Sequence, residues 1–229
     1  MLDFSQFEYL SFDCYGTLID WESGILSYLR PLLTSKGRQV SDDEILNFYS
    51  DSEPRQQQPH RIYRDVLAAV TRDIAREFRV EFSDEEAAGL ATSIRNWGPF
   101  PDTVPALLRL KSRYKLAVLS NIDDDLFAFT APQLGVELDC VVTAQQVQSY
   151  KPALRNFETL LDRLHIKKTQ LLHVAESLYH DVAPARTLGI ASVWVNRRQG
   201  RPAAATKFVS AQPDVEVPTV RALADLVVR

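Results

Sequence analysis

Five short apolar runs recur along the chain, each of the length of a buried strand. They cover residues 8–13, 115–120, 138–143, 171–175 and 190–195. Runs of this kind are typical of strands that are buried on both faces of a parallel sheet. Segments long enough for helices lie at about 103–113, 124–134, 153–164 and 180–188. The alternation predicts an α/β fold with a doubly wound parallel sheet.

Residues 20–97 follow a different pattern, in which amphipathic helical stretches succeed one another without a strand. The expected helices cover about 22–36, 42–51, 61–78 and 84–96, with Ser41 and Ser83 as N-caps and a break over Pro54–Pro59. The pattern predicts an all-helical cap inserted into the sheet domain. The cap would be residues 20–97, and the core domain residues 1–19 and 98–229.

Composition narrows the classes of protein that remain. The chain has 229 residues, 45% of them apolar, and 26 basic against 30 acidic residues give a net charge of −4. This balance argues against nucleic acid as a partner. No apolar stretch approaches the ~20 residues of a membrane span, so we expect no membrane association. Cys14 and Cys140 lack disulfide or zinc spacing, and the N-terminus lacks a basic leader, so we expect an unprocessed protein in the reducing cytoplasm.

Reactive side chains stand where the predicted strands end. In doubly wound sheets, ligands bind beyond the carboxyl ends of the strands. The residues expected there are Asp13, Ser120, Asn121, Lys151, Glu176 and Asp181. This set suits a carboxylate nucleophile: Asp13 attacks an electrophilic carbon or phosphorus atom, and Lys151 compensates negative charge. Ser120 or Asn121 would bind the substrate or the leaving group.

Purely structural roles are the alternatives for these residues. Asp13 could have a purely structural role in a turn, although burying a charged group at the end of an apolar strand costs free energy. Lys151 could be a surface lysine that precedes a helix. For Glu176 and Asp181 a structural role at a helix N-terminus is as well supported as a catalytic one.

The sequence resembles the haloacid dehalogenase-like hydrolase superfamily in four ordered motifs. These are Asp13–Leu18 (DCYGTL), the apolar run that ends at Ser120-Asn121, Tyr150-Lys151-Pro152, and the acidic stretch Glu176–Asp181. The resemblance covers nearly the whole chain. A helical insertion directly after the first motif is similar to the cap of the subgroup that holds the 2-haloacid dehalogenases and many small-molecule phosphatases.

The residue two places after Asp13 bears on the choice between these activities. Phosphatases of the superfamily carry a second aspartate there as the general acid, whereas this chain has Tyr15. A leaving alkoxide needs a proton, but a departing halide needs only stabilisation. The form Asp-x-Tyr-Gly-Thr-Leu also resembles the L-2-haloacid dehalogenases. The resemblance implies hydrolysis of short 2-haloalkanoic acids through an ester on Asp13, with no cofactor and no metal.

The resemblance also implies roles for individual residues. Thr17 holds the nucleophile, Ser120 contacts the substrate carboxylate, and Asn121 helps to cradle the halide. Tyr15 and Glu176 are expected beside the substrate, and Asp181 orients the hydrolytic water. Of the four histidines, only His180, inside the fourth motif, is a candidate for lining the pocket.

Three departures from the dehalogenase pattern stand out. The cap arginine that contacts the halide aligns with Ser50, so Arg55 or Arg61 would have to substitute. A tyrosine six residues after the motif lysine is replaced by Phe157. The fourth motif has Glu176 and Leu178 in place of serine and asparagine.

Two other functions stay open at this point. The first is a magnesium-dependent phosphatase that uses Asp13, the Tyr15 carbonyl group, Glu176 and Asp181. The second is a catalytically silent domain that binds a small acid or a partner protein through the cap. The expected partner is a small 2-haloacid, and a homodimer is one alternative for the assembly.

Overall fold

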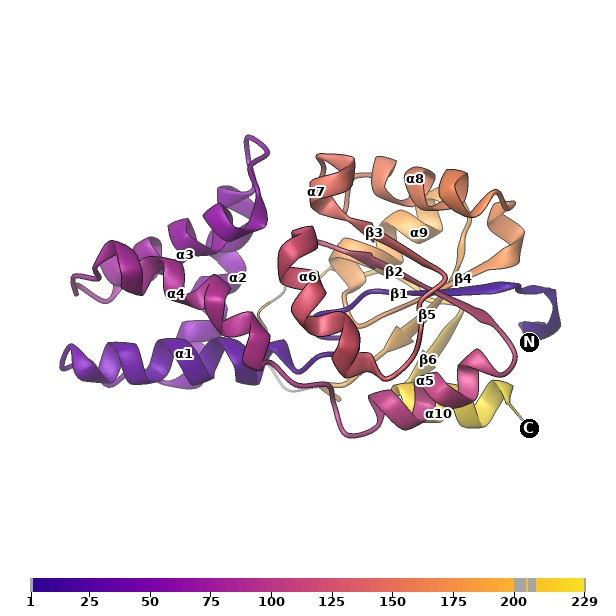
Figure 1. Ribbon diagram of the computed structural model, residues 1–229, viewed down its shortest axis with the longest axis horizontal. Helices are drawn as coiled ribbons and strands as arrows, with labels where there is room; N and C mark the ends of the chain where they lie inside the picture. The colour runs from indigo at the N-terminus through magenta and orange to yellow at the C-terminus, as the bar shows by residue number, and fades with distance from the viewer. Residues whose placement is uncertain (1, 200–204, 206–208, 229) are drawn as a thin grey trace.

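The computed structural model describes residues 2–199, 205 and 209–228. Within these residues six strands form one sheet in the order β3-β2-β1-β4-β5-β6, and all neighbours are parallel (Figure 1). The predicted doubly wound α/β sheet is therefore confirmed. The strands are β1 (Tyr9–Phe12), β2 (Lys115–Ser120), β3 (Cys140–Thr143), β4 (Leu171–Ala175), β5 (Ala191–Val195) and β6 (Val215–Val217).

Helices cover both faces of the sheet (Figure 1). One face carries α5 (Thr103–Lys111) and α10 (Val220–Val227), and the other carries α7 (Ala144–Val147), α8 (Arg155–Leu164) and α9 (Ala183–Leu188). Side chains of β1 alternate between two buried clusters: Leu10 and Phe12 pack on the side of α5, and Tyr9 packs on the side of α8. The sheet is thus buried on both faces, which explains why its strands are continuous apolar runs.

The remaining elements of the core are short. Helix α6 (Asp124–Thr130) follows β2, and a π-helical turn, Leu178–Val182, follows β4. Single 3₁₀ turns cover Phe4–Gln6, Ile94–Asn96, Ala131–Leu134 and Lys168–Gln170. In the part of the chain that the structure describes, no helix is both long and apolar enough to cross a membrane.

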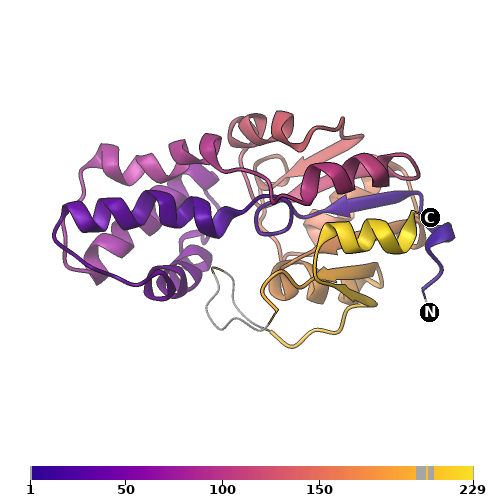
Figure 2. The ribbon, with the colours of Figure 1, turned by 90° about the horizontal axis from the view of Figure 1, so that it is seen from below.

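Four helices lie together at one end of the molecule, beyond the carboxyl edge of the sheet (Figures 1 and 2). They are α1 (Trp21–Ser35), α2 (Asp42–Gln56), α3 (Tyr63–Glu77) and α4 (Asp84–Ser93). Ser41 and Ser83 cap α2 and α4 in full capping boxes, as predicted. The predicted break over Pro54–Pro59 begins later than expected, because α2 continues to Gln56. Contacts to α3 hold this last turn: Ser52 donates to Asp73 at 2.5 Å.

Two chain segments connect these helices to the sheet, and they run side by side. Ile19 forms an antiparallel bridge with Pro99. The Asp20 amide donates to the Gly98 carbonyl at 3.0 Å, and the Phe100 amide donates to the Leu18 carbonyl at 3.0 Å. The two connecting segments are therefore joined by backbone hydrogen bonds at the base of the helices. The division into a core and a cap at residues 19/20 and 97/98 stays a prediction.

Candidate active site

Asp13 is the first residue after β1, and its buried carboxylate is held at both oxygens. Lys151 Nζ donates to Oδ1 at 2.8 Å, and the Thr17 hydroxyl donates to Oδ2 at 2.8 Å. The chain then turns sharply through Gly16, whose φ is +97°. A Cβ atom there would lie 2.9 Å from Nε1 of Trp21, so glycine suits this turn both in conformation and in space. Burial raises the pKa of Asp13, and Lys151 acts in the opposite direction.

Lys151 is a buried cation at the centre of the site, with a side chain only 2% exposed. Its Nζ donates to Oδ1 of Asp13 at 2.8 Å, to Oδ1 of Asp181 at 2.7 Å and to the Leu119 carbonyl at 2.9 Å. All three ammonium donors are thereby used. The Asn121 side chain fixes the backbone of Lys151: its Oδ1 accepts from the Lys151 amide at 2.8 Å, and its Nδ2 donates to the Lys151 carbonyl at 3.1 Å.

Asp181 is the second acid on Lys151, and the π-helical turn after β4 carries it. Its Oδ1 also lies 2.9 Å from Nε2 of His173, whose Nδ1 lies 2.8 Å from the Ser11 hydroxyl. Burial disfavours the ionised form, but Lys151 and His173 outweigh it and lower the pKa of Asp181. Oδ2 of Asp181 is buried without a hydrogen-bond partner among the described residues. Asp181 lines a small pocket in front of the site. Oδ2 is therefore an oxygen atom that can accept a hydrogen bond from water or substrate.

A small pocket of about 40 Å³ opens in front of these side chains. The sheet domain and the helical segment both line it. The lining residues are Asp13, Tyr15, Trp21, Glu53, Tyr63, Ser120, Asn121, Lys151, Ser177, His180 and Asp181. The structure thus brings together Asp13, Lys151, Asp181, Ser120, Asn121 and Tyr15 as predicted, and Thr17 contacts Asp13 directly.

Tyr15 is fixed as a neutral phenol in this pocket. Its hydroxyl lies 2.8 Å from Oγ1 of Thr130, and its ring meets Trp97 edge-on at 6.0 Å between centroids. Burial raises the pKa of Tyr15 well above its usual range. A phenol of this kind is a poor proton donor to a leaving alkoxide, which is the step that the missing second aspartate performs in phosphatases.

His180 also lines the pocket, in agreement with its position in the fourth motif. Its backbone amide donates to Oγ of Ser177 at 3.0 Å, and Nδ1 lies 3.2 Å from the same oxygen. Nε2 is buried without a partner among the described residues. Burial, with Lys151 adding to it, lowers the pKa of His180 to about 4, so the imidazole is neutral at pH 7.

The helical segment contributes Trp21 to the pocket, together with two residues that the sequence patterns did not indicate as site residues, Glu53 and Tyr63. Oε1 of Glu53 accepts from the Tyr63 hydroxyl at 3.0 Å, and that hydroxyl lies 3.1 Å from the hydroxyl of Tyr49. Burial raises the pKa of Glu53 to about 7. One signal could have identified Glu53: it lies on the buried face of α2 with Ile45 and Tyr49, where an acid is rare.

The expectation that Arg55 or Arg61 faces the substrate is not met. Arg55 is exposed because it lies two positions after the buried Glu53 and so points away on α2. Arg61 is half-buried, and its backbone carbonyl accepts from the Tyr150 hydroxyl at 2.8 Å. Neither arginine lines the pocket that holds Asp13. Ser50 is not among the lining residues either.

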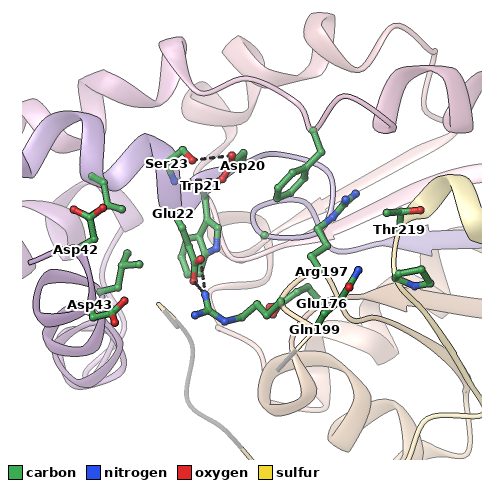
Figure 3. Close-up of a pocket in the computed structure, with 16 residues that line it drawn as sticks. Asp20, Trp21, Glu22, Ser23, Asp42, Asp43, Glu176, Arg197, Gln199 and Thr219 are labelled. Carbon is green, nitrogen blue, oxygen red and sulfur yellow. Dashed lines mark hydrogen bonds and ion pairs between the residues drawn. The ribbon is translucent and has the colours of Figure 1, made fainter. Parts of the chain in front are cut away.

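Glu176 is also displaced from its expected place beside the substrate. It lines a second, larger cavity of about 520 Å³ (Figure 3). Trp21 and Glu22 lie on one side of this cavity, with Arg197 across from them. Burial and the nearby Glu22 raise the pKa of Glu176 to about 8. Trp21 lines both cavities.

The side chains that the phosphatase alternative requires do not all line one pocket. Lys151 already neutralises Oδ1 of both Asp13 and Asp181, and Glu176 belongs to the other cavity. Among residues 2–199, 205 and 209–228, no group of three or more His, Cys, Asp or Glu side chains is arranged to hold a metal ion. What the site offers instead is a carboxylate nucleophile beside a fixed ammonium group and a second carboxylate with a free oxygen.

Comparison with known proteins is consistent with this geometry. A family model described as a haloacid dehalogenase-like hydrolase matches residues 8–189. The chain is 27% identical to (S)-2-haloacid dehalogenase 4A from Burkholderia cepacia over 205 residues, which is 83% of each chain. It is also 27% identical to a glyceraldehyde 3-phosphate phosphatase from Methanothermobacter thermautotrophicus over 162 residues, 62% of this chain and 69% of the relative.

A solved structure supports the fold. The L-2-haloacid dehalogenase from Xanthobacter autotrophicus with chloropropionic acid covalently bound superposes with a TM-score of 0.79. The alignment covers 96% of this chain and 98% of that protein, at 18% identity. The likeness therefore extends over the sheet and the inserted helices alike.

Proposed function

The chain belongs to the haloacid dehalogenase-like hydrolase family, and on that premise we propose that it hydrolyses short 2-haloalkanoic acids to 2-hydroxy acids through an ester on Asp13. The observation that carries this proposal is the buried Asp13–Lys151–Asp181 arrangement at the base of a small pocket. The similarity to an (S)-2-haloacid dehalogenase over most of both chains supports the choice of substrate. In this proposal residues 20–97 are the cap, and residues 1–19 and 98–229 are the catalytic core.

The first step forms the ester. The Asp13 carboxylate attacks C2 of the substrate, the bond from C2 to the halogen breaks, and the halide leaves with the bonding electrons. The ammonium group of Lys151 and the hydroxyl of Thr17 hold the carboxylate in position. Ser120, which is buried at the pocket wall, is the hydroxyl that binds the substrate carboxylate. The negative charge moves from Asp13 to the halide, while Lys151 continues to compensate Asp181.

The second step hydrolyses the ester. Water adds to the carbonyl carbon of the Asp13 ester, and the bond between that carbon and the product oxygen then breaks. Oδ2 of Asp181 has no protein partner among the described residues, so it can orient this water, accept its proton and return that proton to the departing product oxygen. Lys151 lies within 2.8 Å of Oδ1 of Asp13, where it stabilises the developing oxyanion. The reaction needs only groups of this chain and no cofactor.

The test of this function is the release of halide. Chloro-, bromo- and fluoroacetate should each release halide ion, and the rate should be the same with and without EDTA, because no step requires a metal. Halide is measured with an ion-selective electrode, and a panel of phosphate esters is assayed in parallel for phosphate. Phosphate release that depends on magnesium, without halide release, would contradict the proposal and support the phosphatase alternative.

The two cysteines bear on the cellular location of the protein. Cys14 and Cys140 are both free thiols, which supports a reducing compartment such as the cytoplasm. The ligand in this proposal is a small carboxylic acid. The homodimer stays a prediction.

A further inference from the structure

The cap side of the catalytic pocket lacks the group that would be expected to receive a halide anion. Its lining there consists of Trp21, Glu53 and Tyr63. Among the described residues the only cation in the lining is Lys151, and its three donors are already bound to oxygen atoms of the protein. A halide that departs from C2, opposite Asp13, therefore needs a partner from the cap side in addition to Asn121, which also lines the pocket.

Glu53 is the polar side chain best placed for that role. It is 4% exposed, lies at the end of α2 and lines the same pocket as Asp13. The Tyr63 hydroxyl donates to its Oε1, and Tyr49 lies behind Tyr63, so the carboxyl group is fixed in orientation. Because Oε1 accepts from Tyr63, a neutral carboxyl group carries its proton on Oε2.

We propose that the neutral carboxyl group of Glu53 donates the hydrogen bond that stabilises the departing halide. The inference rests on the proposed function and assigns to Glu53 the role that an arginine would otherwise fill. Asp13 forms its bond to C2 while the bond to the halogen breaks, and the halide takes the electron pair. The Glu53 proton is shared with the halide and stays with the carboxyl group when the halide diffuses away.

The surroundings of Glu53 favour its neutral form. Tyr49 and Tyr63 stand beside it, and Tyr150 lies near enough for its pKa to respond to the charge of Glu53. Burial raises the pKa of all three phenols, so none carries a charge near neutral pH. Besides burial, the groups that shift the pKa of Glu53 are the hydroxyl of Tyr63 and the side-chain amide of Gln57, which both lower it, and neither is a cation.

The groups across the pocket act in the same direction. The titratable side chains there are Asp13, Tyr15, Lys151, His180 and Asp181. With both acids ionised and the phenol and imidazole neutral, they sum to one negative charge, so they supply no net positive charge that would favour the ionised form of Glu53. With a pKa of about 7, Glu53 keeps its proton in acid and loses it as the pH rises through neutrality.

The first experiment measures kcat/KM for fluoroacetate and bromoacetate between about pH 5 and about pH 9, so that both sides of the titration are covered. For fluoroacetate, kcat/KM should fall about tenfold per pH unit above the pKa of Glu53, since only the neutral form donates. Bromoacetate should show a smaller fall, because bromide is the better leaving group and depends less on the hydrogen bond.

Variants at Glu53 separate its proton from its packing. Glu53→Gln keeps a donor and the shape, so the alkaline fall should disappear while activity at high pH is retained. Glu53→Ala should lose about 10²-fold in kcat with fluoroacetate, as for the loss of one oxyanion donor, and less with bromoacetate. If the fall persists in Glu53→Gln, or if Glu53→Ala affects both substrates equally, the inference is wrong.

Two matched tyrosine variants add an independent readout. The Tyr63 hydroxyl donates to Glu53 and lowers its pKa, so Tyr63→Phe should shift the alkaline fall to higher pH. Tyr49→Phe removes a hydroxyl that contacts Tyr63 but not Glu53, and should leave the fall where it is. An unmoved fall in Tyr63→Phe would contradict the assignment. Halide release with a flat pH profile overturns this inference alone, whereas no halide release from wild type overturns the proposed function.

Discussion

The Asp13→Asn variant is expected to lose at least about 10⁴-fold in halide release, because the removal of a nucleophile costs up to about 10⁶ in kcat. The neutral amide has nearly the shape of the carboxylate but is a poor nucleophile. The fold should be retained: the buried cluster of Lys151 and Asp181 becomes electrically balanced when Asp13 loses its charge. The free energy of unfolding in urea should therefore be no lower than that of wild type.

Asp139→Asn is the control for this variant. Asp139 precedes β3, at the opposite end of the sheet from the site, where it accepts from the Leu116 amide at 2.8 Å. Its replacement should leave halide release unchanged. Turnover by Asp13→Asn within tenfold of the wild-type rate would show that Asp13 is not the nucleophile.

The Lys151→Met variant is expected to lose both activity and stability. Removal of the cation leaves two buried carboxylates facing each other, and breaking such a buried pair lowers the free energy of unfolding by about 3–5 kcal/mol. Turnover should fall by at least about 10³-fold, since the group that stabilises the ester oxyanion is lost. Urea unfolding and halide release measure the two effects. Lys115→Met is the control, because its ion pair with Glu8 is half-exposed and contributes at most about 1 kcal/mol.

The pH dependence of Lys151→Met tests the reason for its loss of stability. Without the ammonium group, each carboxylate raises the pKa of the other above its value in the unfolded chain. The missing stability should then return as the pH falls and one acid is protonated, and be lost again as the pH rises through the raised pKa. Lys151→Met combined with Asp181→Asn should regain stability at neutral pH without regaining activity. A stability loss that is independent of pH and of Asp181 would instead indicate a packing defect.

The sheet could be predicted from the sequence because its strands are buried on both faces. The runs 115–120 and 171–175 coincide with β2 and β4 at both ends. The runs for β1 and β5 differ from the structure by at most one residue at either end. Strand β6 escaped prediction because Val215–Val217 is only three residues long and is recognised by its pairing with β5. Helix α10 follows it directly and was missed with it.

The site could be predicted only where it is built from strand ends. Ser120 ends β2, and Asp13 and Lys151 follow strands whose carboxyl ends share the same edge of the sheet, so the topology brings them together. Glu53 comes from α2, and the way in which this helix faces the sheet depends on packing between distant segments, which no local pattern contains. Arg55 was chosen for its charge, but the helical period directs it away from the pocket.

The most direct test of the Asp13 ester is a single turnover in water enriched in ¹⁸O, with enzyme in excess over bromoacetate, followed by mass spectrometry of the product and of the peptide that contains Asp13. If the ester forms, the oxygen of the product hydroxyl comes from the Asp13 carboxylate and the heavy oxygen from water enters Asp13. An unlabelled product and a labelled Asp13 are expected. A labelled product with an unlabelled Asp13 would show that water attacks C2 directly, and would contradict the mechanism.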